Sequence, residues 1–173
     1  FGRSVTHIAH LAEAITEFTA RAAVKLRAQN HVACQILVFL RTSPFRKNDE
    51  QYSASIVVPL RRPTADTGHL VRAALSGMQA IYKDGINYAK AGITLLELQP
   101  AGLDQLEIQL DDDPRGRERL MLAMDTLNGR FWPGTVALAS AGTAGEKRQW
   151  SVRQDMRSPC YTTRLSDIMV FQA

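Results

Sequence analysis

Residues 52–61 carry the strictest alternation of side chains in this sequence, and this alternation limits what the chain can fold into. One face is apolar and the other is mostly polar: Tyr52, Ala54, Ile56, Val58 and Leu60 against Ser53, Ser55, Val57 and Arg61. Because successive side chains of a strand point to opposite faces, the pattern predicts a β-strand with one buried and one solvated face.

The segments around this strand predict a complete two-layer arrangement. We expect a short extended opening at residues 1–6, a helix with an apolar stripe at 7–30 and a buried strand at 32–41. A second helix at 64–84 and a further strand at 89–98 follow the alternating strand. The order β-α-β-β-α-β predicts an α+β fold of the ferredoxin-like, split βαβ kind. Both helices are then expected on one face of a four-stranded sheet, which leaves the other face open for function.

Beyond this domain, expected at residues 1–99, the charge pattern changes. Residues 100–114 contain five acids and no base, which is typical of a linker. Residues 115–173 are expected to form a small α/β appendage with a helix at 117–130 and short strands at 135–140 and 149–151. This part is too small for an independent core, so we expect partial order in it.

Composition narrows the class of protein. The net charge of +4 and the isoelectric point near 9.3 permit a nucleic-acid partner without requiring one, and the basic excess lies in the first 62 residues.

No apolar run is long enough to span a membrane, and the two cysteines indicate a reducing cytoplasm. His7 and His10 lack a third ligand, and the acidic run 111–113 is expected to be solvated, so no metal is predicted. The start at Phe1 predicts a piece of a longer protein.

Short hydroxyls and bases on the open face form the candidate site, because they donate hydrogen bonds to phosphate oxygens. They lie on the expected strands, in the loop 41–47 and before the second helix: Arg3, Ser4, Thr6, Arg41, Thr42, Ser43, Ser53, Ser55, Arg61, Arg62, Thr64, Lys90 and Thr94. A plain solvated sheet face, a surface helix cap and a solvated loop are the competing interpretations.

A hexapeptide in the acidic stretch, QLEIQL at residues 105–110, has alternating apolar side chains after a glutamine. An extended peptide of this form can fill pockets on a partner protein through Gln105, Leu106, Ile108 and Leu110. A chance strand-like sequence is the alternative.

Three stretches together resemble one known family. They are FGRSVT at residues 1–6, KAGITLLEL at 90–98 with the QLEIQL hexapeptide, and a tail containing LMLAMDTL at 120–127, Trp150 and SPCYTTR at 158–164. These residues resemble the C-terminal part of UmuC-type translesion DNA polymerases of the Y family, the catalytic subunit of DNA polymerase V.

The resemblance implies a function for each part. Residues 1–99 correspond to the little finger domain, which holds primer-template DNA by its backbone. The hexapeptide is similar to a sliding-clamp motif, and residues 115–173 are similar to the extra domain of UmuC-type proteins. Catalysis with magnesium is expected in the parent chain, ahead of Phe1, so this piece should be inactive and need no cofactor.

The resemblance further implies the setting and the partners. The parent would act in the SOS response, in the bacterial cytoplasm at the nucleoid, with UmuD′ and the RecA filament and with no membrane. Two other functions remain open. One is an adaptor that binds proteins without DNA. The other is an RRM-like RNA-binding domain, which needs stacking aromatics on the central strands where only Phe39 is found.

Overall fold

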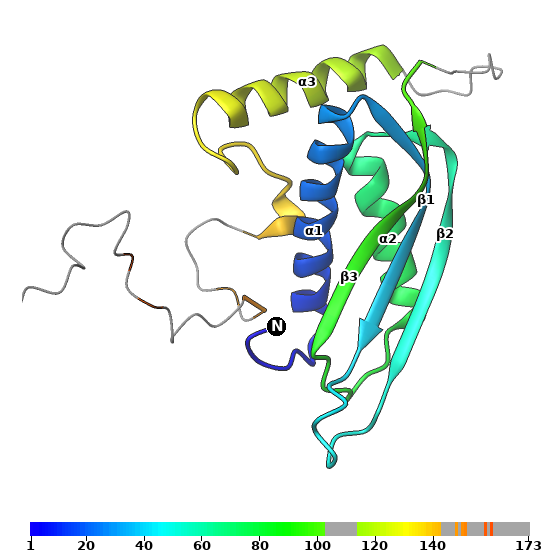
Figure 1. The fold of residues 1–173 in the computed structure, drawn as a ribbon, viewed down its shortest axis with the longest axis vertical. Helices are drawn as coiled ribbons and strands as arrows, with labels where there is room; N and C mark the ends of the chain where they lie inside the picture. Colours follow the sequence, from blue (N-terminus) through cyan, green and yellow to red (C-terminus); the bar gives the residue numbers. More distant parts are fainter. Residues whose placement is uncertain (103–113, 143–147, 149, 152–157, 159, 161–173) are drawn as a thin grey trace, which may run out of the picture.

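A sheet of three antiparallel strands forms one layer of the fold. The central strand β1 (His31–Arg41) pairs with β2 (Ser53–Thr64) on one side and β3 (Lys90–Pro100) on the other (Figure 1). The alternation predicted for residues 52–61 is confirmed, because successive β2 side chains are exposed and half-buried in turn. The computed structural model describes residues 1–102, 114–142, 148, 150–151, 158 and 160.

Two helices form the second layer. α1 (Ile8–Ala28) packs against β3 and β1, and α2 (Thr67–Ile81) packs against β2, β1 and α1. Figure 1 shows the sheet with α2 behind it, so the face toward the viewer is free of helices. The α+β class and the helices on one side of the sheet are therefore confirmed.

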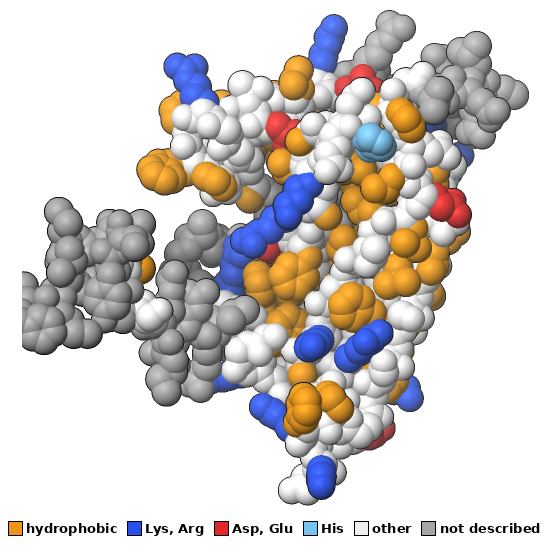
Figure 2. Space-filling model, viewed as in Figure 1, with side chains coloured by type: hydrophobic (Ala, Val, Ile, Leu, Met, Phe, Trp, Pro, Cys, Tyr) orange, Lys and Arg blue, Asp and Glu red, His pale blue; other side chains and the backbone are white. Residues whose placement is uncertain are grey.

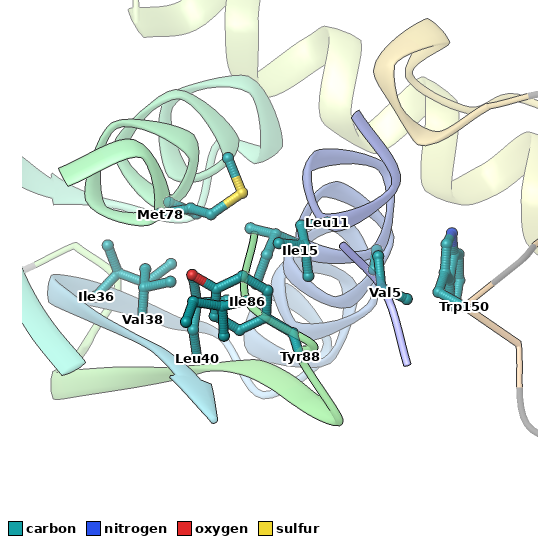
Figure 3. Packing of buried hydrophobic residues seen from close by; sticks show 12 residues of the cluster. Val5, Leu11, Ile15, Ile36, Val38, Leu40, Met78, Ile86, Tyr88 and Trp150 are labelled. Carbon is teal, nitrogen blue, oxygen red and sulfur yellow. The ribbon is translucent and has the colours of Figure 1, made fainter. Parts of the chain in front are cut away.

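The core lies between the sheet and these helices. Ile36, Val38 and Leu40 extend from β1 toward apolar side chains of α1 and α2 (Figure 3). Tyr88 is the largest fully buried side chain among the described residues, and its hydroxyl donates to the Lys83 carbonyl at 3.0 Å and accepts from the Lys83 N–H at 2.8 Å. Burial raises the pKa of Tyr88 above its ordinary value, which keeps the phenol neutral as a donor.

The expected opening strand at residues 1–6 is reduced to one bridge, so the prediction of a four-stranded sheet is wrong for the described residues. Val5 and Tyr88 exchange both backbone hydrogen bonds, at 2.8 and 3.0 Å. The Phe1 amino group instead donates to the Ala89 carbonyl, and the Gly2 N–H donates to the Ser151 carbonyl. Because these bonds go to different segments, no continuous ladder forms.

The C-terminal part contains α3 (Pro114–Arg130) and a short 3₁₀ turn, η1 (Ala139–Ala141). The strand expected at 135–140 is absent, because the Asn128 side chain satisfies both backbone groups of Val136 at 2.9 Å. The described residues of the expected strand 149–151 lie in a turn and a bend. Trp150 is buried there against Phe18 at the edge of the main core (Figure 3), so packing has replaced strand pairing.

Two ion pairs join α3 to the main layer of helices. Arg27 of α1 holds both carboxylate oxygens of Asp125 at 2.7 Å, and Arg117 of α3 donates to both oxygens of Asp66 at 2.7 and 3.1 Å. Met121 is buried between them. These charge-assisted bonds connect residues that are 98 and 51 positions apart in the sequence, separations that local sequence patterns do not report. Within the described residues, no helix is long and apolar enough to cross a membrane.

Asp66 caps α2 and gives the fold an acid-sensitive contact. Its carboxylate accepts the His69 N–H at 2.8 Å at the start of the helix. Burial raises the pKa of Asp66, but the bonds from Arg117 and His69 outweigh it and hold this pKa below its ordinary value of 3.8. A lowered folded pKa stabilises the protein above the ordinary value, and this stabilisation is lost as the pH falls through the folded value.

We therefore expect Asp66→Asn to lower the free energy of unfolding by about 1–2 kcal/mol at neutral pH. The deficit should stay constant down to about pH 5 and shrink below about pH 4, where the Asp66 carboxylate of the unfolded wild-type chain begins to take up a proton before that of the folded protein does. Urea unfolding at several pH values measures it. Glu118→Gln, at an exposed acid of α3, serves as the control and should follow the wild-type profile. An Asp66→Asn deficit that is equal at neutral and acid pH contradicts the assignment.

Candidate nucleic-acid interface

One row across the open sheet face concentrates positive charge. Arg41 of β1 stands directly opposite Ser53 of β2 and Lys90 of β3 in the strand register. All three side chains are exposed, and within the described part of the chain neither base has a carboxylate within ion-pair distance. Like charges directly opposite each other destabilise a sheet, so this row favours an anionic ligand that would neutralise it.

The next row is aromatic. Phe39 stands opposite Ser55 and Gly92, and the Arg41 guanidinium lies 5.4 Å from the centre of its ring. A Cβ at position 92 would lie 2.6 Å from the Phe39 ring, so only glycine allows the ring to lie across β3. Phe39 therefore stiffens this end of the sheet and supports the guanidinium beside it.

Further along the strands the open face becomes apolar. Leu37 stands opposite Val57 and Thr94, and Gln35 stands opposite Pro59 and Leu96. Figure 2 shows hydrophobic side chains over the strands, with Lys and Arg side chains gathered toward one end of the sheet. The polar face predicted from the sequence is thus a mixed surface, with Arg41 and Lys90 at the end where β1 stops and β3 starts.

The candidates at the end of β2 lie on different sides of that strand. Arg61 is exposed on the open face, at the end of the sheet away from Lys90. Arg62 falls on the opposite face by alternation and is half-buried. The Thr64 hydroxyl accepts the Asp66 N–H at 3.1 Å, so it belongs to the turn that leads into α2.

The candidates of the opening segment lie beside the start of β3. Arg3 and Thr6 are exposed, whereas the Ser4 hydroxyl accepts a hydrogen bond from the Arg46 guanidinium at 2.6 Å. Ser4 therefore ties this segment to the loop between β1 and β2. Arg3, Arg41 and Lys90 are exposed basic side chains at this end of the sheet.

In the loop itself, the structure separates the candidates. Thr42 is buried, and its hydroxyl accepts the Tyr52 N–H at 2.9 Å, so it closes the base of the loop. Ser43 is half-buried. The sequence analysis did not select two other residues of this loop, the exposed Phe45 and Gln51, whose side chain hydrogen-bonds to loop carbonyls. The sequence signal that could have indicated Phe45 is its position between a proline and two basic residues.

Two further expectations concern the clamp-binding peptide and a metal site. The clamp-binding candidates Gln105, Leu106, Ile108 and Leu110 lie outside the described residues. Among the described residues, no three His, Cys, Asp or Glu side chains come together in a way that could hold a metal ion. His7 and His10 contact each other edge to face, with ring centres 6.1 Å apart.

The fold and this surface define the class of the chain: a two-layer α+β domain with an open, partly basic sheet face and a C-terminal helix docked by ion pairs. The family model described as "impB/mucB/samB family C-terminal domain" matches residues 1–108, and the model of a domain of unknown function (DUF4113) matches residues 118–170. The chain belongs to the impB/mucB/samB family, as the C-terminal region of a UmuC-type protein, which confirms the resemblance found in the sequence.

Individual relatives match over nearly the whole chain. Protein UmuC of Salmonella typhimurium is 37% identical over 170 residues, which are 98% of this chain and 40% of the relative. Protein ImpB of the same organism is 35% identical over 169 residues, 97% of this chain and 39% of the relative. Protein MucB of Escherichia coli is 36% identical over 168 residues, 94% and 38%. The chain thus spans about two-fifths of the length of these relatives.

Proposed function

We propose that this chain binds primer-template DNA by its phosphate backbone through the open sheet face, as the little finger of a translesion DNA polymerase. The observation that carries the proposal is the pair Arg41 and Lys90, two exposed bases opposite each other on neighbouring strands. A phosphate between them removes their mutual repulsion and releases counterions from the DNA.

The surroundings of this pair fit backbone contact better than base recognition. Ser53 and Ser55 are exposed on the neighbouring strand and offer short donors to phosphate oxygens. Among the residues that the structure describes, no helix lies on the open sheet face, where it could enter a major groove. Binding of this kind ignores base identity, which suits an enzyme region that must tolerate damaged templates.

Fluorescence anisotropy of the 173-residue chain with labelled primer-template DNA, across a salt series, tests the proposal. We expect the logarithm of the association constant to fall linearly with the logarithm of the salt concentration, with a slope of about −3 for phosphate contacts by Arg41, Lys90 and one further basic side chain. The affinity should be equal for DNAs of unrelated sequence. Absence of binding even at low salt overturns the proposal and favours the protein-binding adaptor. Stronger binding to single-stranded RNA than to DNA favours the RRM-like alternative.

A second candidate function is docking on a sliding clamp through Gln105, Leu106, Ile108 and Leu110. The support is the sequence QLEIQL at residues 105–110, which begins five positions after the last residue of β3 and is flanked by acidic residues. Replacing Leu106 and Ile108 by alanine should abolish binding to the clamp and leave DNA binding unchanged. Loss of both activities together would contradict separate surfaces.

The same proposal includes a catalytic activity for the whole protein of which this chain is a part. We place nucleotidyl transfer with magnesium, during SOS damage tolerance, in the part of the relatives that this chain does not cover. UmuD′ and the RecA filament are its proposed partners. In this scheme the described domain positions DNA for an active site elsewhere in the protein.

A further inference from the structure

A cleft opens where the loop between β1 and β2 passes the end of the sheet. It has a volume of about 540 Å³, and its walls combine basic side chains, hydroxyls and the aromatic rings of Phe45 and Tyr52. Arg41 and Lys90 line it on the sheet side, and Pro44 and Phe45 line it on the loop side. Figure 1 shows this loop projecting beyond the strands, at the end where Figure 2 shows basic side chains.

The loop is held by its own hydrogen bonds. The Gln51 side-chain amide donates to the carbonyl oxygens of Ser43, Arg46 and Asp49 at 3.3, 3.1 and 3.2 Å. Asn87 donates to the Asp49 carboxylate at 3.3 Å, which ties the loop to the segment before β3. These bonds fix the path of the backbone at its base and along its length.

Phe45 is the side chain that this scaffold presents. It is 92% exposed, more than any other large hydrophobic side chain of the described residues. An exposed apolar residue alone needs no explanation. Here, however, the ring shares a cleft with Arg41 and Lys90, the bases that the proposed function assigns to phosphate.

The acids around this cleft are already engaged or turned outward. The Asp49 carboxylate contacts Asn87 and lies 3.8 Å from the Arg46 guanidinium. Glu50 is exposed, and it does not line the cleft. The cleft is therefore positive on one wall and aromatic on the other.

We propose that this cleft takes one unpaired nucleotide of a DNA strand, with its phosphate between Arg41 and Lys90 and its base stacked on Phe45. A flat base covers an aromatic ring irrespective of its identity, and a nearby phosphate supplies the charge. A purely apolar peptide would leave the positive charges of Arg41 and Lys90 unneutralised, so the observations favour a nucleotide over a protein partner. The inference rests on the proposed function and extends it from duplex to the single strand beside it.

The experiment compares two DNAs bound by the full 173-residue chain: a blunt hairpin duplex and the same duplex with a 5′ single-stranded template extension that contains 2-aminopurine. We expect wild-type protein to bind the extended DNA about tenfold more tightly and to change the fluorescence of the 2-aminopurine, because stacking on one ring accounts for this factor. Phe45→Ala should lose the tenfold preference and the fluorescence change, yet bind the blunt duplex as wild type does. Phe45→Trp should restore both.

Trp132→Ala serves as the matched control. Trp132 is 80% exposed and follows α3, away from the cleft, so its removal should leave both DNAs bound as before. The inference is overturned if Phe45→Ala retains the preference, if Trp132→Ala loses it equally, or if Phe45→Ala weakens binding to the sliding clamp instead. If wild-type protein binds the blunt duplex but shows no preference, only this inference fails. If it binds neither DNA, the proposed function fails with it.

Discussion

Replacing Arg41, Arg61 and Lys90 together by glutamine is expected to lower the affinity for primer-template DNA by about a hundredfold at low salt. Each of these bases is exposed on the open sheet face, and each lost phosphate contact should flatten the salt dependence by about one unit of slope. The slope of log K against log salt should therefore approach zero. Anisotropy across the same salt series, with wild type alongside, measures both quantities.

A variant with the same change of net charge provides the control for this prediction. Arg72, Lys25 and Arg119 are exposed bases on α2, α1 and α3, and none of them lies on the sheet. Replacing these three by glutamine should change the affinity for DNA only slightly, because salt screens the attraction between DNA and charges that lie away from the sheet face. If both triple variants lose affinity equally, DNA responds to net charge alone and the open face is not the interface.

The open face also shows what the sequence could predict about the site. Alternation along residues 52–61 placed Ser53, Ser55 and Arg61 on one face correctly, because a period of two is a local property of the chain. The opposition of Arg41 and Lys90 could not be predicted in this way. It depends on the register between β1 and β3, which hydrophobic packing across about fifty positions sets.

The fold was predictable where local signals were strong. The helices around Leu11 and Leu70 follow from their apolar stripes. The opening strand failed because Phe1 and Gly2 give their backbone donors to other segments. No local pattern predicts that competition.

The C-terminal part shows the same limit more strongly. Residues 135–140 read as a strand, but the Asn128 amide binds the backbone of Val136 from the preceding helix. Trp150 leaves its predicted strand because burial against Phe18 and Val5 gains more than a single short ladder could. A region too small for a core of its own thus completes the core of its neighbour.

Arg27 links these two regions, and Arg27→Ala is expected to lower the free energy of unfolding by about 3 kcal/mol. Its guanidinium serves three acceptors at once: the Asp125 carboxylate at 2.7 Å, the Ala65 carbonyl at 2.7 Å and the Thr67 hydroxyl at 2.9 Å. The Arg27 side chain is only 16% exposed, so its loss leaves partly buried acceptors without a donor. Urea unfolding monitored by circular dichroism measures the change.

Arg21→Ala, in the same helix, is the control because Arg21 pairs with Glu17 at 2.7 Å in an exposed setting. It should cost at most about 0.5 kcal/mol. Combining Arg27→Ala with Asp125→Ala should cost less than the sum of the two single changes by about 1–3 kcal/mol, since one change already removes the contact that the other would break. Strict additivity would mean that α3 gains nothing from this pair. In that case Arg27 stabilises the start of α2 alone, through Ala65 and Thr67, and α3 is held by Arg117 and Met121.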